Sequence, residues 1–118
     1  MTLVELYQLK GVTYYSTDKF QHRYLYVYDE LFKGLENEHI SLFEIGYASG
    51  GSAKLFADFF KKGSVRCIEI NPLLVYTWEA NPIKHRRLTV ECKDATTIDE
   101  AYFKGLPGGV PDIIIDDG

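Results

Sequence analysis

The sequence contains little of what membrane proteins, disulfide-rich proteins and nucleic-acid-binding proteins require. No apolar run reaches the ~18 residues of a membrane span, and the first residues lack the basic and apolar regions of a signal peptide. Only two of the 118 residues are cysteine, and they have no metal-ligand spacing. The net charge is −4, which disfavours a nucleic-acid-binding face. These absences predict a cytoplasmic protein with neither a membrane nor a nucleic-acid partner.

The few residues that often carry reactive or basic chemistry have ordinary interpretations here. The one basic stretch, residues 84–87 (KHRR), is typical of a solvated entry to a strand. We assign no role to His39 or His85, because no acid or nucleophile lies at an informative spacing from either. Cys67 and Cys92 fit the usual role of free cysteines as small buried hydrophobic residues.

What is present is the composition of one soluble globular domain, residues 1–118, with 46% hydrophobic and 25% charged residues. Residues 1–37 read as a helical entry segment. Within it, residues 20–35 space apolar side chains three and four apart, which predicts an amphipathic helix capped by Ser16 or Thr17. The residues predicted to share its apolar face are Phe20, Tyr24, Tyr28, Leu31, Phe32 and Leu35.

Four short apolar segments, residues 40–45, 65–70, 87–92 and 110–116, predict strands. Between them lie three helical segments: one carrying residues 55–60 and ended by Gly63 as a C′ glycine, one over 73–80, and one over 98–103. Strands that alternate with helices imply right-handed crossovers and a parallel sheet. The predicted fold class is therefore α/β, a Rossmann-like doubly wound, mainly parallel sheet with helices on both faces.

Each predicted strand ends in an acidic residue: Glu44, Glu69, Asp94, and the pair Asp116 and Asp117. Ligands of doubly wound sheets bind outside the carboxyl ends of the strands, where these acids are expected to gather. Crowded carboxylates repel one another unless a cationic or hydroxyl-rich ligand lies among them. S-adenosylmethionine (SAM) is such a ligand, since its sulfonium and amino groups are positive and its ribose offers two hydroxyls. Glu69 is placed to accept both hydroxyls.

The turn after the first strand, residues 46–52 (GYASGGS), fits the same ligand. Gly46 and Gly50 permit unusual backbone angles and a close approach of the backbone to a ligand. Gly51 and Ser52 open the next helix, whose N-terminal amides suit the carboxylate of SAM.

Four motifs in order resemble those of class I SAM-dependent methyltransferases, over about residues 15–118. Residues 42–52 (LFEIGYASGGS) resemble the first SAM-binding motif, in the EIGxxxGGS variant of macrocin and mycinamicin O-methyltransferases and the cephalosporin-hydroxylase group. Residues 68–72 (IEINP) resemble the next motif, where the family usually has Asp and this chain has Glu69. Residues 112–118 (DIIIDDG) resemble the strand-four motif, and residues 16–24 resemble the entry segment of the same group.

This resemblance implies a metal-assisted O-methylation of a sugar or another small-molecule hydroxyl, with SAM as cofactor and Mg²⁺ as metal. Asp117 matches the metal-ligand position, Asp116 is a weaker metal candidate, and Asp94 matches the contact to the adenine amino group. The implied general base lies beyond Gly118, so no catalytic residue is assigned within the chain, which we expect to be the N-terminal part of a longer enzyme. The full set of expected cofactor contacts is Glu44, Gly46, Tyr47, Gly50, Ser52, Glu69, Asp94, Asp116 and His22.

Two alternatives and one surface expectation remain. An NAD(P)-binding oxidoreductase would share the fold, but its GxGxxG spacing differs from glycines at 46, 50 and 51, and Glu44 would repel a pyrophosphate. A non-catalytic Rossmann-like binding domain is the other alternative. Tyr76 and Trp78 are interpreted as core residues in preference to adenine-stacking ones. The fourth strand is expected to be an exposed apolar edge through which copies of the chain can pair.

Overall fold

The computed structural model is an α/β domain of the Rossmann-like type, which confirms the predicted fold class. It describes residues 1–11, 15, 24–48, 50–81 and 85–116. Its centre is a sheet of four parallel strands: β1 (Ser41–Ile45), β2 (Ser64–Glu69), β3 (Leu88–Cys92) and β4 (Ile113–Asp116).

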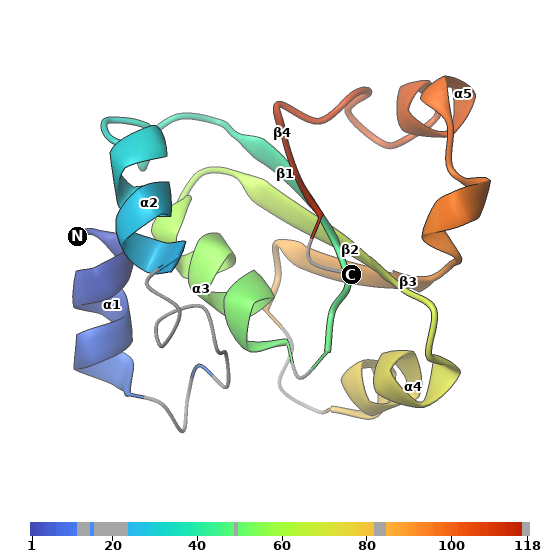
Figure 1. Ribbon diagram of the computed structural model, residues 1–118, viewed down its shortest axis with the longest axis horizontal. Helices are drawn as coiled ribbons and strands as arrows, with labels where there is room; N and C mark the ends of the chain where they lie inside the picture. The colour runs from blue at the N-terminus through green and yellow to red at the C-terminus, as the bar shows by residue number, and fades with distance from the viewer. Residues whose placement is uncertain (12–14, 16–23, 49, 82–84, 117–118) are drawn as a thin grey trace.

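The strand order is β3-β2-β1-β4 (Figure 1), so the chain reverses its direction of winding between β1 and β4. β4 pairs with β1 on one side and forms the edge of the described sheet. Ile114 in this strand is 48% exposed. The apolar edge expected from the sequence is therefore present, and the pairing of copies through it stays a prediction.

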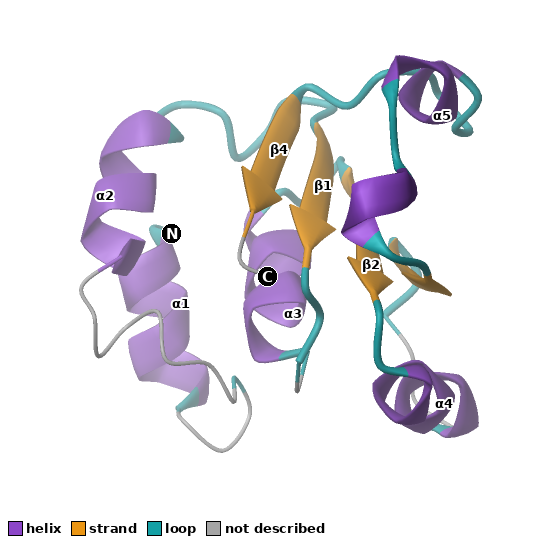
Figure 2. Ribbon diagram, turned by 45° about the vertical axis from the view of Figure 1, so that its right-hand side comes forward, coloured by secondary structure: helices purple, strands orange, loops and turns teal. Residues whose placement is uncertain are grey.

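Helices cover both faces of the sheet, with α1, α2 and α3 on one side and α5 on the other (Figure 2). None of the described helices is long and apolar enough to cross a bilayer. The elements are α1 (Leu3–Lys10), α2 (Tyr24–Leu31), α3 (Gly51–Phe59), α4 (Pro72–Ala80), the short 3₁₀ helix η1 (Ala95–Thr97) and α5 (Glu100–Lys104).

The entry segment differs from its prediction. A separate helix, α1, begins with a capping box in which Thr2 and Glu5 exchange side-chain and backbone hydrogen bonds. α2 ends at Leu31, before the predicted end at residue 35. Of the predicted apolar face, Phe32 is buried and Tyr28 and Leu35 pack against the core, but Tyr24 is 49% and Leu31 66% exposed, and Leu25 is buried instead. The physical reason is that α2 packs beside α1, where the Asp29 carboxylate accepts the first backbone N–H groups of that helix. The predicted caps, residues 16 and 17, and residue 20 lie outside the described residues.

The main hydrophobic core lies between the sheet and α1–α3. α3 contributes Leu55, Phe56 and Phe59, and α4 adds Val75, with Trp78 packed against the same cluster. The predicted core role of Trp78 is confirmed, but Tyr76 is exposed. On the opposite face, Tyr102 and Phe103 of α5 cover the sheet by packing edge-on against the ring of Phe43 in β1.

Gly63 does not serve as the predicted C′ glycine. α3 ends at Phe59, and φ at Gly63 is not positive. A Cβ atom at Gly63 would lie 2.2 Å from the backbone oxygen of Ile40. Glycine is required at this position because the chain passes directly against the start of β1.

Candidate functional site

The carboxyl ends of the four strands are aligned, so the residues that follow them lie along one edge. Ile45 pairs with Ile68 on one side and with Asp116 on the other, and Glu69 pairs with Cys92. A cavity of about 370 Å³ opens at this edge. It is lined by Gly46, Ala48, Ile68, Glu69, Ile70, Lys93, Asp94 and Ala95.

The turn between β1 and α3 uses the backbone angles that its glycines allow. φ is +94° at Gly46 and +83° at Gly50, and Ala48 also adopts a positive φ of +50°. A Cβ atom at Gly50 would lie 2.3 Å from the Tyr47 hydroxyl oxygen, so the tyrosine ring occupies the space that a side chain would need. Tyr47 is partly buried against the hydrophobic core, and this burial raises the pKa of its hydroxyl.

Glu69 holds this turn in place. One carboxylate oxygen accepts the backbone N–H groups of Tyr47 and Ala48, each at 3.0 Å, and the other accepts the N–H of Asn71 at 3.0 Å. Burial alone would raise the pKa of Glu69, but these N–H donors lower it below its ordinary value. Three of its roughly four acceptor positions are filled and the N–H of Ile70 also lies close enough to lower its pKa, so at most one position is open to a ribose hydroxyl.

Glu44 does not line the cavity. Its side chain is fully buried on the α3 side of β1, where the Ser52 hydroxyl lies 2.9 and 3.1 Å from its two oxygens. The Cys67 thiol of β2 lies 4.0 Å from the same carboxylate. Burial raises the pKa of Cys67 well above its ordinary value, and the charges of Glu44 and Glu69 raise it further. Glu44 and Ser52 therefore act beneath the glycine turn and not within the cavity that opens above it.

Asp94 lies in the cavity wall, at the end of β3. Its Oδ1 accepts the backbone N–H of Thr96 at 2.9 Å and the hydroxyl of the same residue at 2.8 Å, which caps η1. These two hydrogen bonds lower the pKa of Asp94. The prediction that Glu69 and Asp94 lie at the same edge of the sheet is therefore correct. In addition, each carboxylate accepts backbone N–H groups and so stabilises the loop beside it.

Of the three remaining predicted site residues, the structure describes only one. Asp116 ends β4 and is exposed next to the end of β1. His22 and Asp117 lie outside the described residues. Within the described ranges, no group of three or more His, Cys, Asp and Glu side chains could hold a metal ion.

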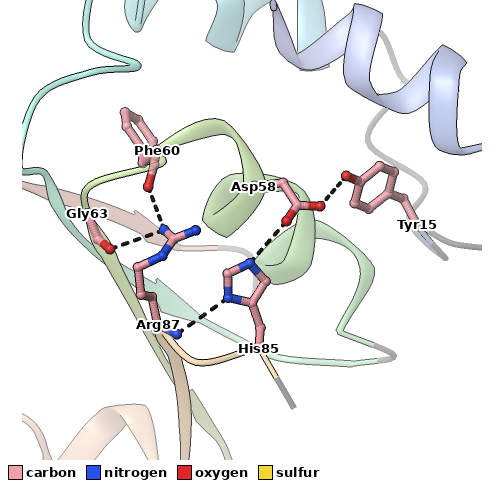
Figure 3. A network of polar contacts seen from close by, with 6 residues as sticks. All are labelled: Tyr15, Asp58, Phe60, Gly63, His85 and Arg87. Carbon is pink, nitrogen blue, oxygen red and sulfur yellow. Dashed lines mark hydrogen bonds and ion pairs between the residues drawn. The ribbon is translucent and has the colours of Figure 1, made fainter. Parts of the chain in front are cut away.

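A polar network that the sequence did not reveal joins the entry segment to α3 and β3 (Figure 3). The Asp58 carboxylate of α3 accepts the hydroxyl of the fully buried Tyr15 through one oxygen, and its other oxygen lies 3.0 Å from His85 Nε2. Arg87 donates through one guanidinium nitrogen to the carbonyls of Phe60 and Gly63. These contacts join residues far apart in the sequence, so no local pattern could have predicted them.

The stretch 84–87 is thus not simply a solvated strand entry. His85 and Arg87 are half-buried and hydrogen-bonded, and Arg86 is exposed, while Lys84 lies outside the described residues. Of the two cysteines, Cys67 is buried as expected, but Cys92 is exposed.

Comparisons with protein-family models, with curated proteins and with solved structures found no match to this chain.

Proposed function

We propose that this chain binds S-adenosylmethionine at the carboxyl edge of its sheet, as the cofactor-binding part of a methyltransferase. The resemblance of its sequence motifs extends the proposal to transfer of the methyl group to the hydroxyl of a sugar or another small molecule. When bound, SAM supplies a methyl group on a positively charged sulfur.

The observation that carries the proposal is the charge around the glycine turn. Glu44 lies directly beneath this turn and Glu69 hydrogen-bonds its backbone, so two carboxylates flank the segment that a cofactor would contact. Their negative charges favour a cationic ligand, and they disfavour the pyrophosphate of a dinucleotide. Because SAM and NAD both carry an adenosine, the adenosine cannot distinguish them. The charge around the glycine turn does, since it favours the cationic SAM.

The cavity fits the adenosine part of the cofactor. Its volume of about 370 Å³ is within the usual range for small-molecule sites. At most one acceptor position of Glu69 is open to a ribose hydroxyl, and Asp94 offers a carboxylate one strand further along. No described side chain caps the N-terminus of α3, whose backbone amides suit the carboxylate of the cofactor. No step is assigned to a metal, because Asp117 lies outside the described residues.

Calorimetric titration of the full chain with SAM, S-adenosylhomocysteine and NAD⁺ tests the proposal. We expect both sulfur nucleosides to bind and NAD⁺ not to bind. Tighter binding of NAD⁺ would identify an oxidoreductase domain, and binding of none of the three would favour a non-catalytic domain.

A Glu44→Gln variant tests the charge argument itself. It keeps the size of the buried side chain and removes its charge. We expect it to weaken the binding of SAM more than that of S-adenosylhomocysteine, because only SAM carries a sulfonium charge. The matched control is Glu79→Gln on the exposed side of α4, which should change neither affinity.

A further inference from the structure

A second cavity, of about 200 Å³, lies at the opposite end of the sheet from the proposed cofactor site. It is bounded by the amino ends of β1 and β2 and by the segment that joins α5 to β4. Figure 2 shows this segment passing over the end of the sheet where the strands begin. The cavity therefore shares no lining residue with the site at the carboxyl edge.

The lining of this cavity has one sign of charge. Arg66, Arg86 and Arg87 line it, and no Asp or Glu does so among the described residues. This concentration of positive charge is unexpected in a chain whose net charge is −4. The acidic residue adjoining the lining, Asp112, accepts the backbone N–H of Ser41 at 2.8 Å.

Arg66 lies on the α5 face of the sheet. It pairs in register with Phe43 of β1, whose ring contacts Phe103 of α5 at 5.1 Å between centroids. Thr89 of β3 is its register partner on the other side and lines the same cavity. The positive charge of Arg66 lowers the pKa of the nearby Tyr102, although burial and Glu91 raise that pKa overall to about 12.

The three guanidinium groups differ in whether they have hydrogen-bond partners within the protein. Arg87 is fixed by its two backbone carbonyl acceptors. Within the described part of the chain, the guanidinium groups of Arg66 and Arg86 form no hydrogen bond and no ion pair, although Arg66 is half-buried. A half-buried cation without a partner is unfavourable, and an anion that enters the cavity would relieve that cost.

We propose that this cavity binds the phosphate group of a small molecule, with Arg66 and Arg86 as its charged ligands. The planar guanidinium fork matches phosphate oxygens in a bidentate manner. The hydroxyls of Ser41, Ser64 and Thr89 also line the cavity and can donate to further oxygens. Its volume suits a compact anion and is small for a nucleotide base.

The test is a calorimetric titration of the full chain with inorganic phosphate, with ionic strength held constant by sodium chloride. We expect saturable binding with one site. Arg66→Gln and Arg86→Gln should each weaken it about tenfold, the equivalent of one lost charge-assisted hydrogen bond. Lys61→Gln removes the same charge from an exposed position outside the lining and should change the affinity less than about twofold.

Circular dichroism of each variant checks that it is folded. Because Arg86 is exposed, its replacement decides the question if Arg66→Gln does not fold. Tighter binding of glycerol 3-phosphate than of inorganic phosphate would identify an esterified phosphate as the ligand, and weaker binding would identify the free ion. The proposal is overturned if phosphate does not saturate, if Lys61→Gln weakens binding as much as the arginine variants, or if succinate binds as tightly as phosphate.

Discussion

Replacing Glu69 by Gln should destabilise the protein, because the carboxylate anchors three backbone N–H groups of two loops. Glutamine keeps one oxygen, which can still accept two of these N–H groups with the weaker strength of a neutral acceptor. Its amide NH₂ would replace the second carboxylate oxygen. Since the NH₂ and the third backbone N–H are both donors, that N–H would lose its acceptor. A hydrogen bond to a charged group contributes roughly 1.5–3 kcal/mol, about twice the neutral value. The expected loss is therefore about 3 kcal/mol at pH 7.

The pH dependence gives a second, independent readout. The pKa of Glu69 is lowered in the folded protein from 4.5, so its contribution to stability is present above pH 4.5 and is lost as the pH falls through the lower folded pKa. The difference between the wild type and Glu69→Gln should therefore shrink below pH 4.5. Urea unfolding at several pH values measures this, with Glu79→Gln as the exposed control. A loss at pH 7 below about 0.5 kcal/mol, or a difference that does not shrink in acid, would refute the assigned role.

Three further predictions follow from the contacts. Gly63→Ala should cost at least about 2 kcal/mol in urea unfolding, because its Cβ would overlap a backbone oxygen, whereas Gly105→Ala, whose nearest neighbour is 3.4 Å away, should be neutral or stabilise by up to about 1 kcal/mol. Equal effects would contradict the close approach at Gly63. A thiol reagent should modify the exposed Cys92 in the folded protein and reach Cys67 only in denaturant, because burial both shields this thiol and raises its pKa; two rapidly reacting thiols in the folded protein would be inconsistent with this. Asp58→Asn should lower the free energy of unfolding by about 2 kcal/mol, since it removes the charge that the tyrosine and histidine of Figure 3 share; an unchanged urea midpoint would mean that the network does not stabilise the fold.

The layout of the fold could be predicted from the sequence because its signals are local. The four apolar segments and the glycine- and proline-rich turns between them located all four strands, and the observed starts differ from the predicted ones by one to three residues. The alternation of strands and helices then fixed a parallel sheet, and with it the edge on which Glu69 and Asp94 lie.

Side-chain direction and long-range pairing could not be predicted in the same way. Glu44 is near the end of its strand, but neighbouring strand residues point to opposite faces, and its own side chain points toward α3 and is buried there. The contact between Asp58 and His85 depends on the packing of α3 beside the entry to β3. α1 does carry a local sequence signal, the capping box of Thr2 and Glu5, which marks the start of a separate helix within residues 1–37.

The most direct test of the central claim is the location of the cofactor site. Two-dimensional ¹H–¹⁵N NMR spectra of the labelled chain, recorded during titration with S-adenosylhomocysteine, report on each backbone amide. We predict that the largest shifts fall on Gly46, Glu69, Ile70 and Asp94, which line the cavity at the carboxyl edge. Shifts confined to other parts of the chain, or none at saturating ligand, would contradict it.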